Sequence, residues 1–195
     1  MIKLVKPLIL IIAIYTCGIC KGQASQKCPE IKWKNGSEAA KKIMKSDFYY
    51  DALDAWSPFG SDTGSDTYYL YCEWRKENPK ESVRKFLDGE LISFEYPGFD
   101  IYLDGSNTER LKTIVSTMRN NYVDLNYIDE LVISLAFSQL FLEGRIEPEV
   151  KKWAEAAFSR EAAFLVFWGD GKDDLKERKE REQRMNQLLT DLRKG

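Results

Sequence analysis

The sequence predicts an α+β fold: a single, mostly helical domain with one small antiparallel two-stranded element. Apolar residues recur at helical spacing in several segments from residue 37 onward. Residues 127–142 are apolar on almost every side, which indicates a helix at the centre of the core. Residues 90–96 partly alternate apolar and polar side chains, as a strand does. With 195 residues, 44% of them hydrophobic, the chain is long enough for one domain, which we place at residues 25–195.

The first 24 residues have the pattern of a signal peptide. Lys3 and Lys6 precede an uncharged run from residue 8 to residue 20, and the small residues Gly22 and Ala24 predict cleavage after Ala24. The run is shorter than the ~18 residues that span a bilayer, so we expect no stable transmembrane span there. The mature protein is therefore expected in the periplasm or outside the cell.

The four cysteines divide between the signal peptide and the domain. Cys17 has an aliphatic residue three positions before it, as in a bacterial lipobox, so a lipid anchor at Cys17 is the alternative to free export. Cys28 and Cys72 remain after cleavage, and an oxidising compartment favours a disulfide between them. This bond would tie the polar N-terminal arm, residues 25–36, to the middle of the chain and contribute ~2–4 kcal/mol. One buried and one exposed thiol is the alternative.

In the first half of the domain, Ser37 caps a short helix that ends near residue 45. A first-turn proline predicts another helix over residues 79–88. The strand at residues 90–96 follows, a Pro-Gly pair breaks it, and residues 99–103 return as its partner. This hairpin is the β element of the predicted fold.

The second half of the domain is predicted to be helical. Ser106 and Glu109 form a capping box ahead of one helix, and Asn126 caps the central helix at residues 127–142. Two shorter helices then begin at Pro148 and Ser159.

The last helix is predicted over residues 174–192. Its first half is charged on all sides, and oppositely charged residues four positions apart support it. These pairs are Asp174–Arg178, Glu177–Arg181 and Glu180–Arg184. An apolar stripe in its second half indicates that the helix docks on the domain by its end, with docking on a partner as the alternative.

The most unusual stretch is residues 57–67, in which the tetrapeptide Gly-Ser-Asp-Thr occurs twice in tandem. Calcium binds about 6–8 oxygen atoms, and Asp62 and Asp66 with the neighbouring hydroxyls offer such ligands. Calcium is the one cofactor that this pattern suggests. The alternative is structural: the side chains of Ser61, Asp62 and Thr63 bond to the backbone of turns. Asp66 or Thr67 then caps a helix that runs to residue 76.

Several reactions are excluded because the sequence contains no histidine. Neither a Ser-His or Cys-His nucleophile nor an imidazole zinc site can form. The formal charge of −2 gives no electrostatic reason to expect nucleic acid as a partner. Carboxylate chemistry remains, and the candidates are Asp47, Asp51, Asp54, Asp62 and Asp66.

Aromatic residues surround the repeat on both sides. Aromatic faces beside acids and amides hold sugars and cationic ligands in many sites, but most such residues simply pack in the core. Trp56 and Tyr49 are the two that we select as candidate ligand contacts.

Three segments, 45–51, 57–66 and 73–79, resemble a pattern in a bacterial family of uncharacterised proteins of the YfeS type. The likeness extends over residues 37–90. That family has no established reaction or ligand, so the resemblance assigns no functional residue. The signal peptide and the helical second half are departures from the family pattern.

Together these observations predict an exported, non-enzymatic protein of the bacterial envelope that binds a protein or a small ligand near the repeat. Asp62, Asp66, Trp56 and Tyr49 are the candidate binding residues. A cation-dependent or carboxylate-based hydrolase that uses the aspartates of residues 47–66 is the alternative.

Overall fold

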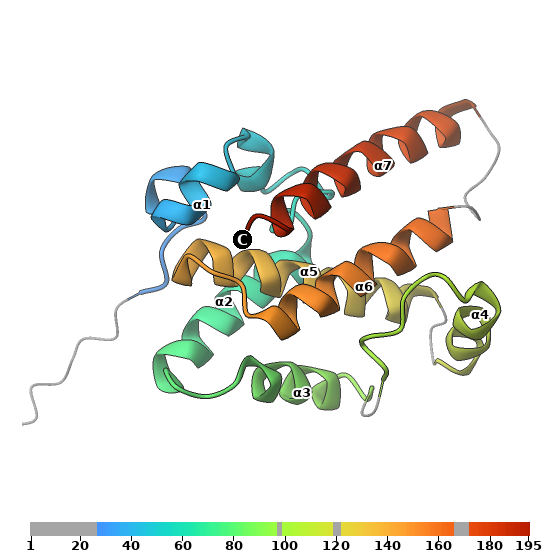
Figure 1. Ribbon diagram of the computed structural model, residues 1–195, viewed down its shortest axis with the longest axis horizontal. Coiled ribbons are helices and arrows are strands. Elements are labelled where there is room, and N and C mark those ends of the chain that lie inside the picture. Colours follow the sequence, from blue (N-terminus) through green and yellow to red (C-terminus); the bar gives the residue numbers. More distant parts are fainter. Residues whose placement is uncertain (1–26, 97–98, 119–121, 166–171) are drawn as a thin grey trace, which may run out of the picture.

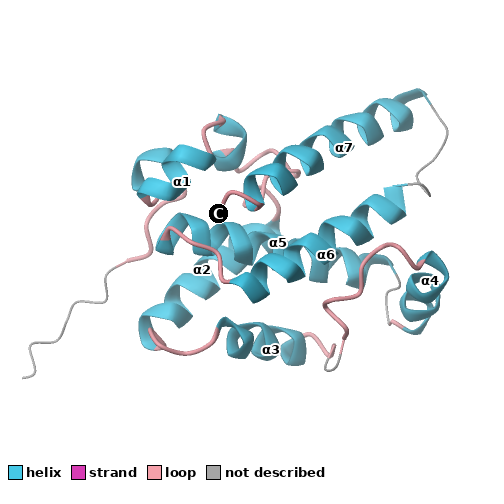
Figure 2. Ribbon diagram, in the orientation of Figure 1, coloured by secondary structure: helices cyan, strands magenta, loops and turns pink. Residues whose placement is uncertain are grey.

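The computed structural model describes residues 27–96, 99–118, 122–165 and 172–195 (Figure 1). Within these ranges the secondary structure is helical throughout, with no strand (Figure 2). The predicted signal peptide, including Cys17, lies outside the described residues. The helices are η1 (Trp33–Asn35), α1 (Glu38–Ile43), η2 (Asp47–Tyr50), α2 (Asp62–Glu77), α3 (Val83–Ser93), α4 (Thr108–Thr117), α5 (Tyr122–Glu143), α6 (Pro148–Leu165) and α7 (Lys172–Leu192).

The α5 helix is the centre of the core, as its composition predicted. Helices α2 and α6 pack along it, and α1 and α4 contact its ends (Figure 1). Residues 123–143 are long and apolar enough to cross a membrane, but most of them are buried inside the protein. The helix begins at Tyr122, so Asn126 lies within it and does not cap it. The Asn126 side chain instead donates a hydrogen bond to Glu130 (2.7 Å).

The predicted α+β class is wrong, because the described residues contain no strand pair. Residues 90–93 continue α3 past the expected end at residue 88, and residues 99–103 form turns. The buried side chains of α3 follow helical spacing, while Ile92 is 63% exposed, so no strand face is buried there. The alternation that suggested a strand covers too few residues to separate the two periods. The buried side chains of α3 are Val83, Phe86, Leu87 and Leu91.

The helix boundaries are confirmed in part. Ser37 caps α1 and accepts a hydrogen bond from Ala40 N (3.0 Å), and α6 begins at Pro148 as predicted. Asn107, rather than Ser106, caps α4, and α6 continues through Ser159 without a break. A Ser or Asn next to the true cap can form the same local bonds, so the sequence fixes such a start only to within a residue or two.

The α7 helix docks by its C-terminal half. Met185, Leu188 and Leu192 are buried there. Two arginines of the charged half make tertiary ion pairs in place of the predicted pairs within the helix: Arg181 pairs with Glu161 and Arg184 with Asp54. The remaining predicted pair is Asp174–Arg178, and the side chain of Asp174 lies outside the described residues.

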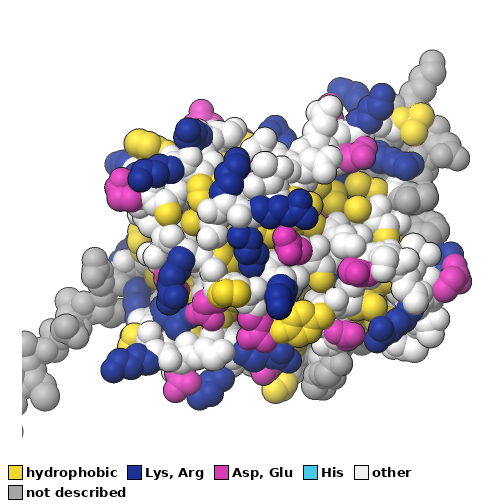
Figure 3. Space-filling model, in the orientation of Figure 1, with side chains coloured by type: hydrophobic (Ala, Val, Ile, Leu, Met, Phe, Trp, Pro, Cys, Tyr) yellow, Lys and Arg dark blue, Asp and Glu magenta, His cyan; other side chains and the backbone are white. Residues whose placement is uncertain are grey.

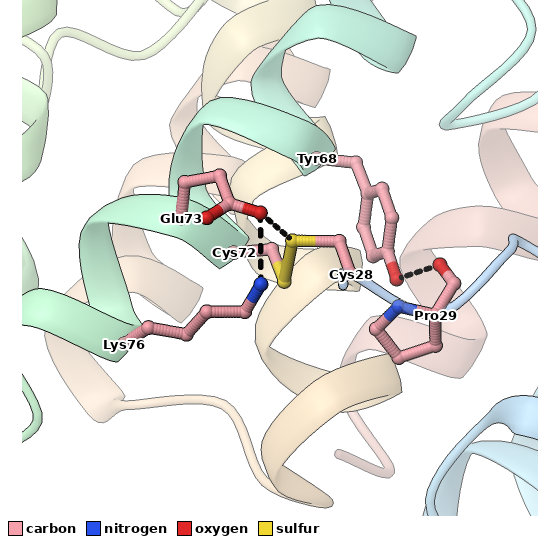
Figure 4. Close-up of a disulfide and its surroundings, with 6 residues drawn as sticks. All are labelled: Cys28, Pro29, Tyr68, Cys72, Glu73 and Lys76. Carbon is pink, nitrogen blue, oxygen red and sulfur yellow. Dashed lines mark hydrogen bonds and ion pairs between the residues drawn. A yellow bond between two sulfur atoms is a disulfide. The ribbon is translucent and has the colours of Figure 1, made fainter. Parts of the chain in front are cut away.

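The disulfide between Cys28 and Cys72 is present. It joins the N-terminal arm to α2, with the two Cα atoms 6.1 Å apart (Figure 4). The Tyr68 hydroxyl donates a hydrogen bond to the carbonyl oxygen of Pro29 (2.6 Å), which fixes the arm a second time. The arm therefore holds the middle of α2 in place by one covalent bond and one polar contact.

Candidate functional site

The Gly-Ser-Asp-Thr repeat forms the start of a helix. The α2 helix begins at Asp62, five or six residues before the predicted start. Its N-cap is Ser61, whose hydroxyl accepts a hydrogen bond from Gly64 N (3.0 Å) and donates one to Glu130 (2.8 Å). The prediction that Asp66 or Thr67 caps the helix is therefore wrong. A glycine inside a helix costs ~1 kcal/mol relative to alanine, so the repeat suggested a turn.

Gly64 is required by close packing. A Cβ atom at this position would lie 2.4 Å from the carbonyl oxygen of Pro58 and 3.0 Å from Ser134 Oγ. The same serine donates a hydrogen bond to the Pro58 carbonyl (2.5 Å). The first turn of α2, the segment before it and α5 therefore meet at a point where only hydrogen fits. The repeat thus has a structural task in the fold.

Asp62 and Asp66 are exposed on the outer side of α2, one turn apart. Asp51 and Asp54 accept hydrogen bonds from backbone amides two residues further on (2.9 and 3.0 Å), which is the geometry of local turns. Asp47 is exposed in η2. The structure thus spreads the five aspartates over two turns and two helices.

A group of ligand atoms suited to a metal would need at least three of them close together. Among the described residues, one group of three acids or cysteines has its ligand atoms within 4.8 Å of one another. It consists of Cys28, Cys72 and Glu73. Both sulfurs of that group are in the disulfide. The aspartates that we selected for calcium or hydrolysis do not form such a group.

Tyr49 and Trp56 line two adjoining hollows beside α7. The first hollow, with a volume of about 320 Å³, includes Tyr49, and the second, of about 610 Å³, includes Trp56. Both share Arg184 and Gln187, which joins them into one groove. We call the first the basic hollow, the second the outer hollow, and the two together the α7 groove.

The basic hollow is strongly cationic, in a chain whose formal charge is −2. Its charged lining consists of Lys42, Lys45, Arg184 and Lys194, against the single carboxylate of Asp191. Lys and Arg side chains gather on this face, over α1 and the C-terminal part of α7 (Figure 3). A hollow with this charge attracts anions.

The carboxylate of the basic hollow is already satisfied. Asp191 accepts hydrogen bonds from the Tyr49 hydroxyl (2.6 Å), Gln187 (2.5 Å) and Lys194 (2.5 Å). Burial alone would raise the pKa of Asp191, but these three bonds outweigh it and hold the pKa below its ordinary value. Burial and the neighbouring carboxylate raise the pKa of Tyr49, so its hydroxyl stays protonated and donates. Asp191 therefore holds the side chains of Tyr49, Gln187 and Lys194 in place, and its single negative charge offsets only one of the four cations that line the hollow.

Arg184 stands where the two hollows meet. Its guanidinium lies 4.3 Å from the centre of the Phe48 ring and 3.7 Å from the carboxylate of Asp54. Stacking on an aromatic face orients the planar guanidinium but uses none of its N–H donors. Arg184 can therefore present two parallel donors to a carboxylate or phosphate.

Trp56 connects the groove to charges inside the protein. The Arg181 guanidinium lies 4.6 Å from its ring centre and pairs with Glu161. Both charged side chains are at least nine-tenths buried. Burial raises the pKa of Glu161, and the charge of Arg181 opposes this shift.

A second buried pair lies between α5 and α6. Arg160 donates from Nε to Asp129 (2.8 Å) and from Nη1 to the carbonyl oxygens of Ile101 (3.2 Å) and Leu103 (2.5 Å). Burial raises the pKa of Asp129 to about 7, against the opposing effect of Arg160. This pair was not predicted from the sequence. Its signal was Asp129, an acid within the segment predicted to be the buried central helix, since buried charges are nearly always paired.

Comparison with known proteins gave no relative: no family model matches the chain, and no curated protein or solved structure does. The resemblance to YfeS-type proteins is therefore a prediction that nothing here tests. The fold and the groove define the class: an all-helical protein over its described residues, with a groove beside its last helix that contains one strongly basic hollow.

Proposed function

We propose that this is an exported, non-enzymatic binding protein that takes a small anionic ligand in the α7 groove. Export follows from the signal peptide predicted at residues 1–24. The observation that supports binding most directly is the basic hollow, in which four cationic side chains face one carboxylate that is already hydrogen-bonded. Its size, about 320 Å³, is within the usual range for small-ligand sites.

The two hollows suit different parts of one ligand. A phosphate or carboxylate would lie in the basic hollow, where Arg184 can bind two of its oxygens. The outer hollow offers the amides of Gln183 and Gln187 and the carboxylates of Asp54 and Glu180 beside Trp56. Amides and carboxylates bind hydroxyls, and an aromatic ring can pack against the apolar side of a sugar ring. The ligand class is therefore a hydroxyl-rich molecule with one anionic group.

The binding proposal is preferred to the hydrolase because the aspartates of residues 47–66 lie on separate turns and helices. The groove also includes Tyr49 and Trp56, which the sequence had selected as ligand contacts. Asp62 and Asp66 are absent from its lining.

The test is calorimetric titration with glucose 6-phosphate, galacturonate and, as a neutral control, glucose. We expect the two anions to bind and glucose not to bind, with weaker binding as salt rises. Arg184→Gln should weaken binding about tenfold or more, since a hydrogen bond to a charged group contributes ~1.5–3 kcal/mol. The matched control is Arg145→Gln, at a 70% exposed side chain outside the groove, which should bind as the wild type does. Equal binding of glucose, or an unchanged affinity in Arg184→Gln, would show that the proposal is wrong.

A further inference from the structure

We propose that the outer side of α2, together with α3, docks a cationic amphipathic segment of a partner protein. This surface is separate from the α7 groove, and the inference does not depend on the ligand proposed there. Asp62 and Asp66 lie too far from other acids to form a metal site, but on this surface they would contribute negative charge that attracts a cationic partner.

One stripe of α2 faces away from the core. From one turn to the next its members are three or four residues apart, with acids at both ends and two adjacent large apolar side chains in the middle. Tyr69 is 42% exposed and Leu70 is 50% exposed. The stripe consists of Asp62, Asp66, Tyr69, Leu70, Glu73 and Glu77.

A hollow of about 330 Å³ lies beside this stripe, between α2 and α3. Its apolar floor is formed by Leu70, Trp74 and Phe86. Single exposed apolar residues need no explanation, but an apolar floor beside exposed apolar residues is the usual mark of an interaction site. The shape suits side chains of leucine size projecting from a partner helix.

The rim of this hollow is acidic. Glu73, Glu77 and Glu90 line it, and Lys85 is its one cation. Lys85 is paired with Glu81 (2.5 Å), which does not line the hollow, and Glu73 is paired with Lys76 of the same helix (2.8 Å). The negative charge of the rim therefore comes mainly from Glu77 and Glu90. Burial raises the pKa of Glu90, and a partner cation would favour the ionised form.

The surface is already ordered, which lowers the entropic cost of binding. The Trp74 ring lies between the Phe86 ring (5.6 Å between centres) and the Arg75 guanidinium (5.0 Å). Arg75 in turn pairs with Glu143 of α5 (3.1 Å). The disulfide between Cys72 and Cys28 also ties α2 to the N-terminal arm.

These features identify the partner's chemistry. An acidic rim around an apolar floor complements a helix with leucine-type residues on one face and Lys or Arg at its edges. It disfavours an anionic membrane. It also disfavours a symmetric dimer, in which each copy would place its acids against the same acids of the other.

The probe is a synthetic amphipathic helix of roughly four turns, with leucines on one face and lysines around them. The control peptide carries glutamate in place of every lysine. We expect the lysine peptide to bind the chain from residue 25 onward with micromolar affinity in fluorescence anisotropy, and the glutamate peptide not to bind.

Three variants locate the site. Leu70→Ser and Glu77→Lys should each weaken binding about tenfold. The first removes an apolar contact of the floor, and the second replaces an acid of the rim by a cation that repels the lysines of the peptide. Both positions are exposed, so the fold should be kept, and circular dichroism checks this. The matched control is Leu53→Ser, at a side chain that is 95% exposed outside α2 and α3.

Several outcomes would overturn the proposal. These are no binding of the lysine peptide, equal binding of the glutamate peptide, or unchanged affinity in Leu70→Ser. Sedimentation of the free protein provides one more test: a wild-type dimer that Leu70→Ser converts to a monomer would mean that the surface joins two copies of this chain.

Discussion

The hydroxyl of Ser61 joins two distant parts of the chain, because it caps α2 through Gly64 N and also donates to Glu130 of α5 (2.8 Å). The serine of the first tetrapeptide therefore fixes where α2 begins and how it sits on the central helix. The equivalent serine of the second tetrapeptide, Ser65, lies inside α2. Identical sequence units thus have different structural tasks.

Replacing these two serines should separate the tasks. Ser61→Ala should lower the free energy of unfolding by ~1–2 kcal/mol, because it removes a helix cap. Ser65→Ala should have little effect or a slight stabilising one, since alanine is the better helix former. Urea unfolding measures both, and equal effects would mean that Ser61 is not the cap in solution.

The glycines provide a second matched pair. Gly64→Ala should destabilise the protein by ~1–3 kcal/mol, because the new methyl group would overlap the Pro58 carbonyl. Gly89→Ala should stabilise by ~0.5–1 kcal/mol, because no atom lies within 4 Å of its Cβ position in α3. Thermal unfolding should give shifts of opposite sign. Two shifts of the same sign would contradict the packing at Gly64.

Removing the disulfide should be costly. The double variant Cys28→Ser/Cys72→Ser should lose ~2–4 kcal/mol of stability, since the bond closes a long loop. Reductant should lower the melting temperature of the wild type but leave the variant unchanged. Mass analysis of the alkylated protein should find both thiols blocked before reduction and both free after it.

The buried pair of Asp129 and Arg160 predicts a pH dependence. Because burial raises the pKa of Asp129 from 3.8 to about 7, folding favours its protonated form. Its contribution to stability is complete below about pH 4 and is lost as the pH rises through about 7. The stability of the wild type relative to Asp129→Asn should therefore be greater at pH 5 than at pH 8. Urea unfolding at both values tests this, and a difference that grows with pH would have the wrong sign.

Part of the fold could be predicted from local patterns. The apolar residues of α5 identify the core helix, and Ser37 and Pro148 mark helix starts, because such features depend on neighbours in the sequence. The strand prediction at residues 90–96 failed for the same reason. Tertiary packing decides which period the segment adopts: Leu91 is buried with the other core residues of α3, and Ile92 is exposed.

The α7 groove could not be predicted as a site. Tyr49 and Trp56 were chosen for their aromatic rings, but the charge of the groove comes from residues far apart in the sequence, such as Lys42 and Arg184. They meet because the apolar end of α7 docks beside η2. The i,i+4 pattern instead assigned Arg184 to a neighbour in its own helix. Tertiary packing, which no local pattern records, decides such pairs.

The central claim is that the small anionic ligand binds in the α7 groove and not at the repeat. Two-dimensional NMR of the nitrogen-15-labelled chain from residue 25 onward, titrated with glucose 6-phosphate, tests it most directly. We expect the backbone amides of Ser46 and Tyr49 and the side-chain amide of Gln187 to shift, and those of Asp62 and Asp66 to stay in place. Shifts at the two aspartates with none in the groove would contradict the claim.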